Sequence, residues 1–445
     1  MSSSVGPTRR TGEVVRALVM SPITVWAAFV LVHLWLGLLN LYAPGLPFGD
    51  VTLVYKFWMD QAFIGHVWVG IDTVWVYPIA AILPMIASYA FGTDLYGSTW
   101  LTMVMLLDAV AFGFLTGWGR SRERVGVAWW WIGFLLLLGP IALGRIDSVS
   151  VPFALVGVIL IASRPRAAAV LLAIATWIKV WPAAILLAAL IALKDRWRIL
   201  AAILLVSAAI IFIALGLGSG ANVFTFITEQ TGRGLQPESP IGSAFLWQAL
   251  AQVPGAQVYY DQTILSYGVR GPGDAFWISV ITPLQALAVL AIAVLGLRAV
   301  RRHAAPGDLF PPLALALTLA LLAFNKVGSP QYIAWLAVPI VLGIATHTAG
   351  HGRSFRTPAI IGLVIAALTQ LIYPYLYNDL LGLNPMLISA LSVRNILEFV
   401  LLGWAIRAVV IAPRAPESAE TQAWLPSVWP LAEASTAADP AATRP

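Results

Sequence analysis

The side chains of this sequence that could do chemistry gather in short polar segments between long apolar runs. The first such segment carries Asp50, Tyr55, Trp58, Asp60 and Tyr77. A carboxylate can take a proton from an attacking hydroxyl group, and aromatic rings offer a flat apolar face of the size of a sugar ring. We predict that Asp50 is the catalytic base, because it comes directly after the first apolar run, and that Asp60 is the alternative.

Later polar segments supply the positive charges that a phosphate leaving group needs. The four candidates for binding a phosphate are Arg145, Lys179, Arg233 and Lys326. Fixed cations in a poorly solvated site stabilise the charge that a phosphate gains as its bond to the transferred group breaks. The residues expected to contact a sugar or an acceptor are Tyr55, Trp58, Tyr77, Asp60, Glu229, Gln230, Gln236 and Gln331.

Several of these residues also have a purely structural interpretation. Asp50 follows a Pro-Phe-Gly run and could cap a short helix. Arg145 and Asp147 flank a predicted helix start, where they could pair with each other. Lys326 could extend along the protein towards the membrane surface with no ligand.

The composition decides the class of protein that positions these residues. Of the 445 residues, 60% are hydrophobic and 10% are charged, and the mean hydropathy is +0.86. Soluble domains carry about 25% charged residues. Several apolar runs reach the roughly 20 residues that cross a bilayer, and the alternating strands of a membrane barrel are missing. The sequence therefore predicts an all-α polytopic membrane bundle.

Other counts narrow the function. The chain has no cysteine, which removes disulfides, thiolate metal sites and cysteine nucleophiles. The net charge of +6 comes from Arg and Lys clusters between apolar runs, where they set topology, so it does not indicate nucleic-acid binding. The first apolar run is too long for the core of a signal peptide. We predict no cofactor.

The positive clusters predict how the chain crosses the membrane. Arg9, Arg10 and Arg16 precede a first span at about Ile23 to Leu41, so the N-terminus should be cytoplasmic and Asp50 extracytoplasmic. The later clusters that should also be cytoplasmic are Arg120, Arg122 and Arg124; Arg164 and Arg166; Lys194, Arg196 and Arg198; Arg298, Arg301 and Arg302; and Arg353 and Arg356.

Two apolar stretches do not fit simple crossings. The stretch 74–91 contains two prolines and is predicted to be interfacial or re-entrant, and the next span is placed at 100–117. A 27-residue apolar stretch around Lys179 and Pro182 has positive charges at both ends, so it should enter the membrane and return as a broken helical hairpin. Lys179 would then point into a cavity; the alternative is one long tilted helix.

This topology gives the organisation of the whole chain. Residues 1–21 form a cytoplasmic N-terminal segment, residues 22–411 a membrane domain with about eleven to thirteen membrane helices, and residues 412–445 a disordered cytoplasmic tail rich in Ala, Pro, Glu, Ser and Thr. The unusual polar residues fall on the extracytoplasmic side. No phosphate-binding loop or dinucleotide fingerprint is present, so a reaction there would draw on a lipid-borne activated group.

The residues of the first loop resemble a known family. The run Gly49, Asp50, Val54, Tyr55, Trp58, Gly65 and Trp75 to Pro78 is similar to the first extracytoplasmic loop of GT-C class glycosyltransferases, in particular the actinobacterial polyprenyl-phosphate-mannose-dependent mannosyltransferases. Supporting matches are Arg145 to Asp147, Lys179 to Pro182, and Asn325 to Tyr332 with Trp335.

The resemblance implies an inverting transfer of a sugar, with mannose favoured. The donor would be a polyprenyl-phosphate sugar, the acceptor a lipid or a glycan, and the base Asp50. The site would lie on the extracytoplasmic side of the plasma membrane and would not need a metal. Transfer of arabinofuranose or another sugar stays open, as do a lipid or polysaccharide flippase and a non-catalytic protein of envelope assembly.

Overall fold

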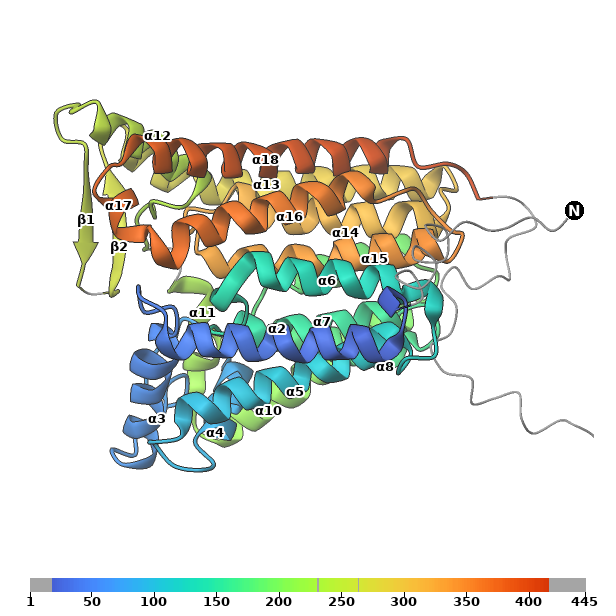
Figure 1. Cartoon of the computed structure of the whole chain (residues 1–445), viewed down its shortest axis with the longest axis horizontal. Helices are drawn as coiled ribbons and strands as arrows, with labels where there is room; N and C mark the ends of the chain where they lie inside the picture. The colour runs from blue at the N-terminus through green and yellow to red at the C-terminus, as the bar shows by residue number, and fades with distance from the viewer. Residues whose placement is uncertain (1–17, 230–231, 263, 416–445) are drawn as a thin grey trace, which may run out of the picture.

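A computed structural model of the chain describes residues 18–229, 232–262 and 264–415. Long helices run side by side along one axis (Figure 1). In this described part, nine helices are long and apolar enough to cross a membrane, three of them when an adjoining 3₁₀- or π-helical segment is included. They are α2 (Pro22–Tyr42), α5 (Tyr96–Thr116), α6 (Val125–Leu138), α10 (Arg196–Gly216), α13 (Asp274–Arg301), α14 (Pro306–Ala323), α15 (Ala337–Thr348), α16 (Arg356–Gln370) and α18 (Pro385–Val410).

Shorter elements complete the bundle. The apolar ones are α4 (Ile82–Ser88), α7 (Asp147–Leu160), α8 (Pro165–Ile178) and α9 (Ala183–Ala192). The others are α3 (Lys56–Phe63), α11 (Thr225–Thr228), α12 (Pro240–Leu250), α17 (Tyr377–Leu381), β1 (Gln257–Asp261) and β2 (Ser266–Arg270). The helical, multi-pass membrane class is thus confirmed, whereas the span count of eleven to thirteen stays a prediction.

The break around Lys179 is present as the sequence predicts. Helix α8 ends at Ile178, and Lys179 has extended backbone angles of −151° and 132°. Pro182 then precedes the first residue of α9. Because proline lacks a backbone donor and disfavours helix at the preceding residue, the chain leaves the helix here and restarts. The single tilted helix is wrong.

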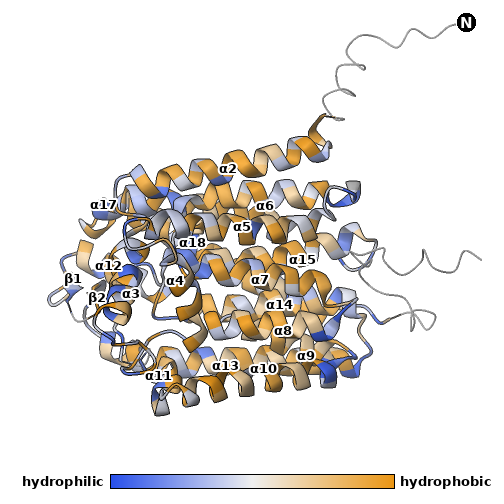
Figure 2. Cartoon of the chain, turned by 90° about the horizontal axis from the view of Figure 1, so that it is seen from below, coloured by the Kyte–Doolittle hydropathy of each residue, from blue (hydrophilic) through white to orange (hydrophobic). Residues whose placement is uncertain are grey.

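The two ends of the bundle differ. Helices α3 and α12 and the β1–β2 hairpin gather at one end, at the left of Figure 1, which we call the loop-rich end. Helix α2 begins and α18 finishes at the opposite end. Figure 2 shows apolar residues along the helices and hydrophilic residues at both ends. The positive clusters 120–124, 164–166, 194–198, 298–302 and 353–356 lie at the end where α2 begins.

Burial separates the centre of the bundle from its outer face. Helix α14 is 83% buried over its most apolar window, whereas α10 and α13 are 17% buried and present apolar side chains outward, as lipid contact requires. Ionisable groups inside the bundle are paired, as their cost in lipid demands. His33 Nε2 lies 3.1 Å from Asp108 Oδ2, and Arg394 lies 3.6 Å from Glu398.

A second, small core supports the loop-rich end. Strands β1 and β2 pair antiparallel, with Tyr260 opposite Tyr267. Val269 of β2 is buried in a cluster that also contains Leu235, Phe245 and Leu391. The hairpin is therefore packed on α12, which in turn packs on α18.

Candidate active site

Asp50 lies at the loop-rich end, at the first residue of a π-helical turn, Asp50–Tyr55, that leads into α3. Its Oδ2 lies 3.0 Å from Arg145 Nε, and its side chain stays 37% exposed. Gly49, not Asp50, is the N-cap residue, so the capping interpretation of Asp50 is wrong. π-Helical turns are rare and are frequent at functional sites. The Asp50 carboxylate is thus fixed by Arg145 and still partly accessible.

Arg145 is buried and fully engaged. Besides Asp50, its guanidinium donates to Pro47 O at 2.5 Å, Gly144 O at 2.8 Å and Tyr373 Oη at 2.8 Å. This arrangement fixes the position of the Asp50 carboxylate through a charge-assisted contact. Arg145 therefore faces Asp50, while the other three predicted phosphate-binding cations lie elsewhere.

Asp147 has partners that the sequence did not indicate. Its Oδ1 accepts from Trp335 Nε1 at 2.6 Å, and its Oδ2 lies 4.0 Å from Lys179 Nζ. The expected pair between Arg145 and Asp147 does not form. Residues two apart at a helix start point in different directions, so each reaches a different neighbour.

The predicted aromatic residues do come together. The ring centroids of Tyr55 and Trp58 lie 5.7 Å apart, and those of Trp58 and Tyr77 lie 6.1 Å apart. The hydroxyl groups of Tyr55 and Tyr77 are 3.5 Å apart. Burial raises the pKa of Tyr77, which also lies within electrostatic reach of Lys179 and Asp50. Tyr77 thus connects the Asp50 region with the Lys179 region.

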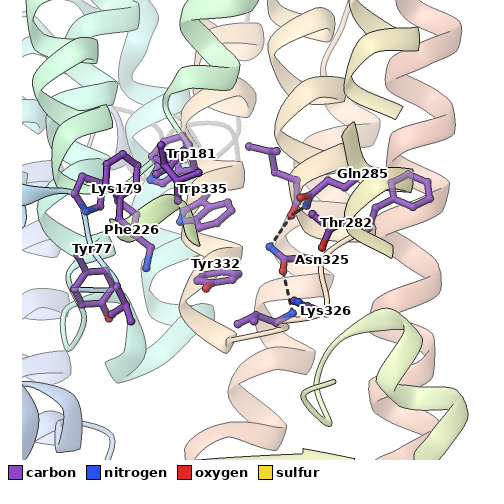
Figure 3. A pocket seen from close by; sticks show the side chains of 17 residues that line it. Tyr77, Lys179, Trp181, Phe226, Thr282, Gln285, Asn325, Lys326, Tyr332 and Trp335 are labelled. Atoms are coloured by element: carbon purple, nitrogen blue, oxygen red, sulfur yellow. Dashed lines mark hydrogen bonds between the residues drawn. The ribbon is translucent and has the colours of Figure 1, made fainter. Parts of the chain in front are cut away.

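A cavity of about 320 Å³ opens beside Tyr77, and Figure 3 shows its walls. Lys179 Nζ lies 4.4 Å from the centroid of the Tyr77 ring and 5.3 Å from that of Tyr332. Lys326 enters from the opposite wall, with Tyr332 between the two lysines in this view. The remaining lining is mostly apolar and aromatic, and consists of Val76, Pro78, Val180, Trp181, Phe226, Ile227, Thr282, Gln285, Leu321, Phe324, Asn325, Val327 and Trp335.

Lys326 and Arg233 add charge to this cavity. The Lys326 side chain is buried, at 5% exposed. Burial lowers the pKa of Lys326, and the positive charge of the half-buried Arg233 lowers it further. Arg233 also lies within electrostatic reach of Lys179. Two of the four predicted cations, Lys179 and Lys326, therefore line one cavity, and Arg233 lies within electrostatic reach of both. Asp147 balances one of these positive charges, so the region keeps an excess of positive charge that would favour an anion.

Two loops hold Lys326 in place. Gln236 N donates to Lys326 O at 2.9 Å, and Gln236 Oε1 accepts from Ser329 Oγ at 3.3 Å. A Cβ on Gly328 would collide with the backbone of Glu238 and Ser239. The loops at 235–239 and 326–329 thus touch backbone to backbone, because residue 328 has no side chain.

The other predicted site residues lie in different surroundings. Asp60 is about 15 Å along the helix from Asp50 at 1.5 Å per residue. It accepts hydrogen bonds from Tyr89 and Thr93 and lies 3.7 Å from Lys56 Nζ. Glu229 is exposed, Gln331 is 8% exposed beside Tyr332, and Gln230 lies outside the described residues.

Several residues of the site were not among the predicted ones. Asp147 was considered only as a possible partner of Arg145 and within a longer motif, Trp335 was noted only beside a motif, and Tyr332 ended one. Tyr373 and Tyr377 carry no local signal, because their contacts come from segments more than 100 residues away. In the part of the chain that the structure describes, no three His, Asp or Glu side chains converge as a metal site would need.

The arrangement can hold an anion against Lys179 and Lys326, with Arg233 within electrostatic reach, while the fixed, partly exposed Asp50 carboxylate accepts a proton. Tyr77, which packs on Trp58, lies within electrostatic reach of both Lys179 and Asp50. No protein-family model, no curated protein and no solved structure matches this chain.

Proposed function

We propose that this protein is an inverting glycosyltransferase that moves a sugar, with mannose favoured, from a polyprenyl-phosphate donor to a lipid or glycan acceptor. The observation that carries the proposal is the cavity lined by Lys179 and Lys326, with Arg233 within electrostatic reach of both lysines and Tyr77 connecting the cavity with Asp50. Its apolar lining suits the first part of a lipid chain, and its cations suit a phosphate.

The proposed reaction is a single displacement. Asp50 takes the proton of an acceptor hydroxyl group as its oxygen bonds to the anomeric carbon of the donor sugar. The bond between that carbon and the phosphate oxygen breaks, and the electron pair stays on the phosphate. Lys179, Lys326 and Arg233 stabilise the charge that polyprenyl phosphate gains, more in the transition state than in the bound donor. Arg145 keeps the Asp50 carboxylate in position.

The sidedness belongs to the same proposal. The positive clusters lie at the end where α2 begins, which the positive-inside rule assigns to the cytoplasm. The loop-rich end, with Asp50, would then face outward from the plasma membrane. Single cysteines beside Asp50 and Lys326 in this cysteine-free chain should react with an impermeant maleimide in intact cells. Labelling only after lysis would reverse the topology.

The direct test is transfer by purified protein in lipid nanodiscs. Polyprenyl-phosphate mannose with a radiolabelled sugar is supplied with a mannosyl glycolipid acceptor. We expect a labelled, longer glycolipid and one free polyprenyl phosphate for each sugar moved. A flippase in vesicles would move the intact donor between leaflets with no new glycosidic bond, and that result would replace the proposal.

A further inference from the structure

Four tyrosine rings form a continuous row at the loop-rich end. The ring centroids of Tyr260 and Tyr267, on the two strands of the hairpin, lie 5.0 Å apart. Tyr267 lies 6.1 Å from Tyr377 of α17, and Tyr377 lies 5.4 Å from Tyr373. We call this row the tyrosine track. It joins the hairpin with the segment between α16 and α18.

The tyrosine track ends at the candidate base. The hydroxyl group of Tyr373 accepts a hydrogen bond from Arg145 at 2.8 Å, and Arg145 Nε lies 3.0 Å from Asp50. The far end is open: Tyr260 is 48% exposed and Tyr267 is 36% exposed. The row therefore runs from the surface of the hairpin to the residue beside the Asp50 carboxylate.

The chemistry of the tyrosine track differs from that of the cation-lined cavity. Tyrosine rings present apolar faces, and their hydroxyl groups donate and accept hydrogen bonds. The carboxylates nearest to it are Asp50 at one end and Glu238, which hydrogen-bonds Tyr377. The charge of Arg145, which contacts Tyr373, is already balanced by Asp50, so an uncharged, hydroxyl-rich molecule with apolar faces fits the row better than a phosphate.

The hairpin that carries the outer rings is held firmly. Gln236 Nε2 donates to Ser266 Oγ at 2.9 Å, and Val269 N donates to Leu235 O at 2.9 Å. Val269 itself is buried. Rings that are fixed before a ligand arrives lose little conformational freedom on binding, which favours recognition.

We infer that the tyrosine track binds the part of a glycan acceptor that lies beyond the reacting hydroxyl group. The inference rests on the proposed function and makes it narrower, because it assigns the acceptor as a chain of several sugar units. The terminal sugar lies at Asp50, and the preceding units lie over Tyr373, Tyr377, Tyr267 and Tyr260. Three successive steps between rings give room for more than one sugar.

The test compares a long and a short acceptor in the full-length protein in nanodiscs. The variant replaces both outer rings, Tyr260→Ala and Tyr267→Ala. Transfer to a tetramannosyl glycolipid should show a KM about tenfold higher, which corresponds to about 1.4 kcal/mol of lost binding. The ratio of kcat/KM between the tetramannosyl and a monomannosyl acceptor should fall by the same factor.

The controls separate binding from folding. Tyr42→Ala removes another tyrosine near this end, 79% exposed and outside the tyrosine track, and should leave the ratio unchanged. Tyr260→Phe with Tyr267→Phe keeps both rings, so it should lose less than the alanine variant. If the alanine variant failed to fold, the phenylalanine variant and Tyr260→Ala alone would supply the comparison.

A second readout does not need transfer. Saturation-transfer NMR with free mannotetraose should detect binding by the parent protein, weakened in the alanine variant. If the protein bound mannotetraose but transferred sugar to no acceptor, the proposed function would be wrong. The assignment of the tyrosine track as a glycan-binding surface would still stand. If the alanine variant changed kcat/KM equally for both acceptors, or for neither, the tyrosine track would not bind the acceptor. The proposed function would still stand.

Discussion

The two regions that flank Asp50 are built from opposite kinds of side chain. The cavity beside Tyr77 is lined by Lys179 and Lys326, with Arg233 within electrostatic reach and Asp147 beside Lys179. The tyrosine track on the other side has hydroxyl groups and the Glu238 carboxylate. The cavity keeps an excess of positive charge after Asp147 is counted, whereas Arg145, the cation at the inner end of the tyrosine track, is paired with Asp50. The cavity therefore suits an anion better than the tyrosine track does, so charge helps to distinguish a donor from an acceptor.

The comparison depends most on Asp50, the point where both regions meet. Asp50→Asn keeps the shape of the side chain but removes its basicity, so transfer should fall by about 10² to 10⁴. Binding of the polyprenyl-phosphate donor should persist. Asp60→Asn is the matched control. The Asp60 carboxylate already accepts hydrogen bonds from Tyr89 and Thr93 and pairs with Lys56, so this substitution should lower transfer less than Asp50→Asn does. Near-parental transfer by Asp50→Asn with an inactive Asp60→Asn would move the base to Asp60.

The second-largest effect on transfer is expected from removing positive charge from the cavity. Lys179→Met with Lys326→Met preserves chain length and apolar contacts while removing two cations, and should lower kcat/KM for the donor by about 10²-fold, or about 2.7 kcal/mol. The KM for the acceptor should hardly change. Lys56→Met, on α3 beside Asp60, is the matched control. Unchanged donor kinetics in the double variant would remove the phosphate role of the cavity.

A smaller effect is expected where the tyrosine track meets Arg145. Tyr373→Phe removes the hydroxyl group that accepts from Arg145 at 2.8 Å and keeps the ring. Loss of one hydrogen bond to a charged group costs about 1.5 kcal/mol, so kcat should fall about tenfold with little change in donor binding. A larger change in donor KM than in kcat would show that Arg145 serves the cavity and not Asp50.

The smallest effect is a shift in pH dependence. Burial and the charge of Arg233 lower the pKa of Lys326, so its ammonium charge is present at low pH and lost as pH rises through that lowered value. Donor binding should therefore weaken at alkaline pH. Arg233→Gln removes one of the two causes, so the alkaline limb should move to higher pH although binding is weaker throughout. A shift to lower pH would contradict this charge coupling.

Local signals predicted the helical membrane class, the first span and the helix break near Lys179. The first span, expected at Ile23 to Leu41, is α2 at Pro22–Tyr42, and the break at Pro182 follows from proline chemistry. Both features depend on residues within one turn of each other and on the positive charges at helix ends. Such information is present in any short stretch of sequence.

Contacts between segments far apart in the chain leave no signal in the local sequence. Arg145 was predicted to hold a phosphate, and its contact with Asp50 depends on how α7 packs beside the turn that begins α3. The tyrosine track depends likewise on the position of a hairpin that no apolar periodicity marks. Composition identified the residue types that the site needs, and only the packing of the bundle sorted them into two regions.

Gly328 has a consequence for how mutations in this gene would be tolerated. It carries no functional group, yet a side chain there would push apart the loop that holds Lys326 and the loop that anchors the hairpin. One substitution would therefore disturb the cation-lined cavity and the tyrosine track together. In a scan of all single substitutions, position 328 should be as intolerant as Asp50, whereas exposed Glu229 should accept most residues.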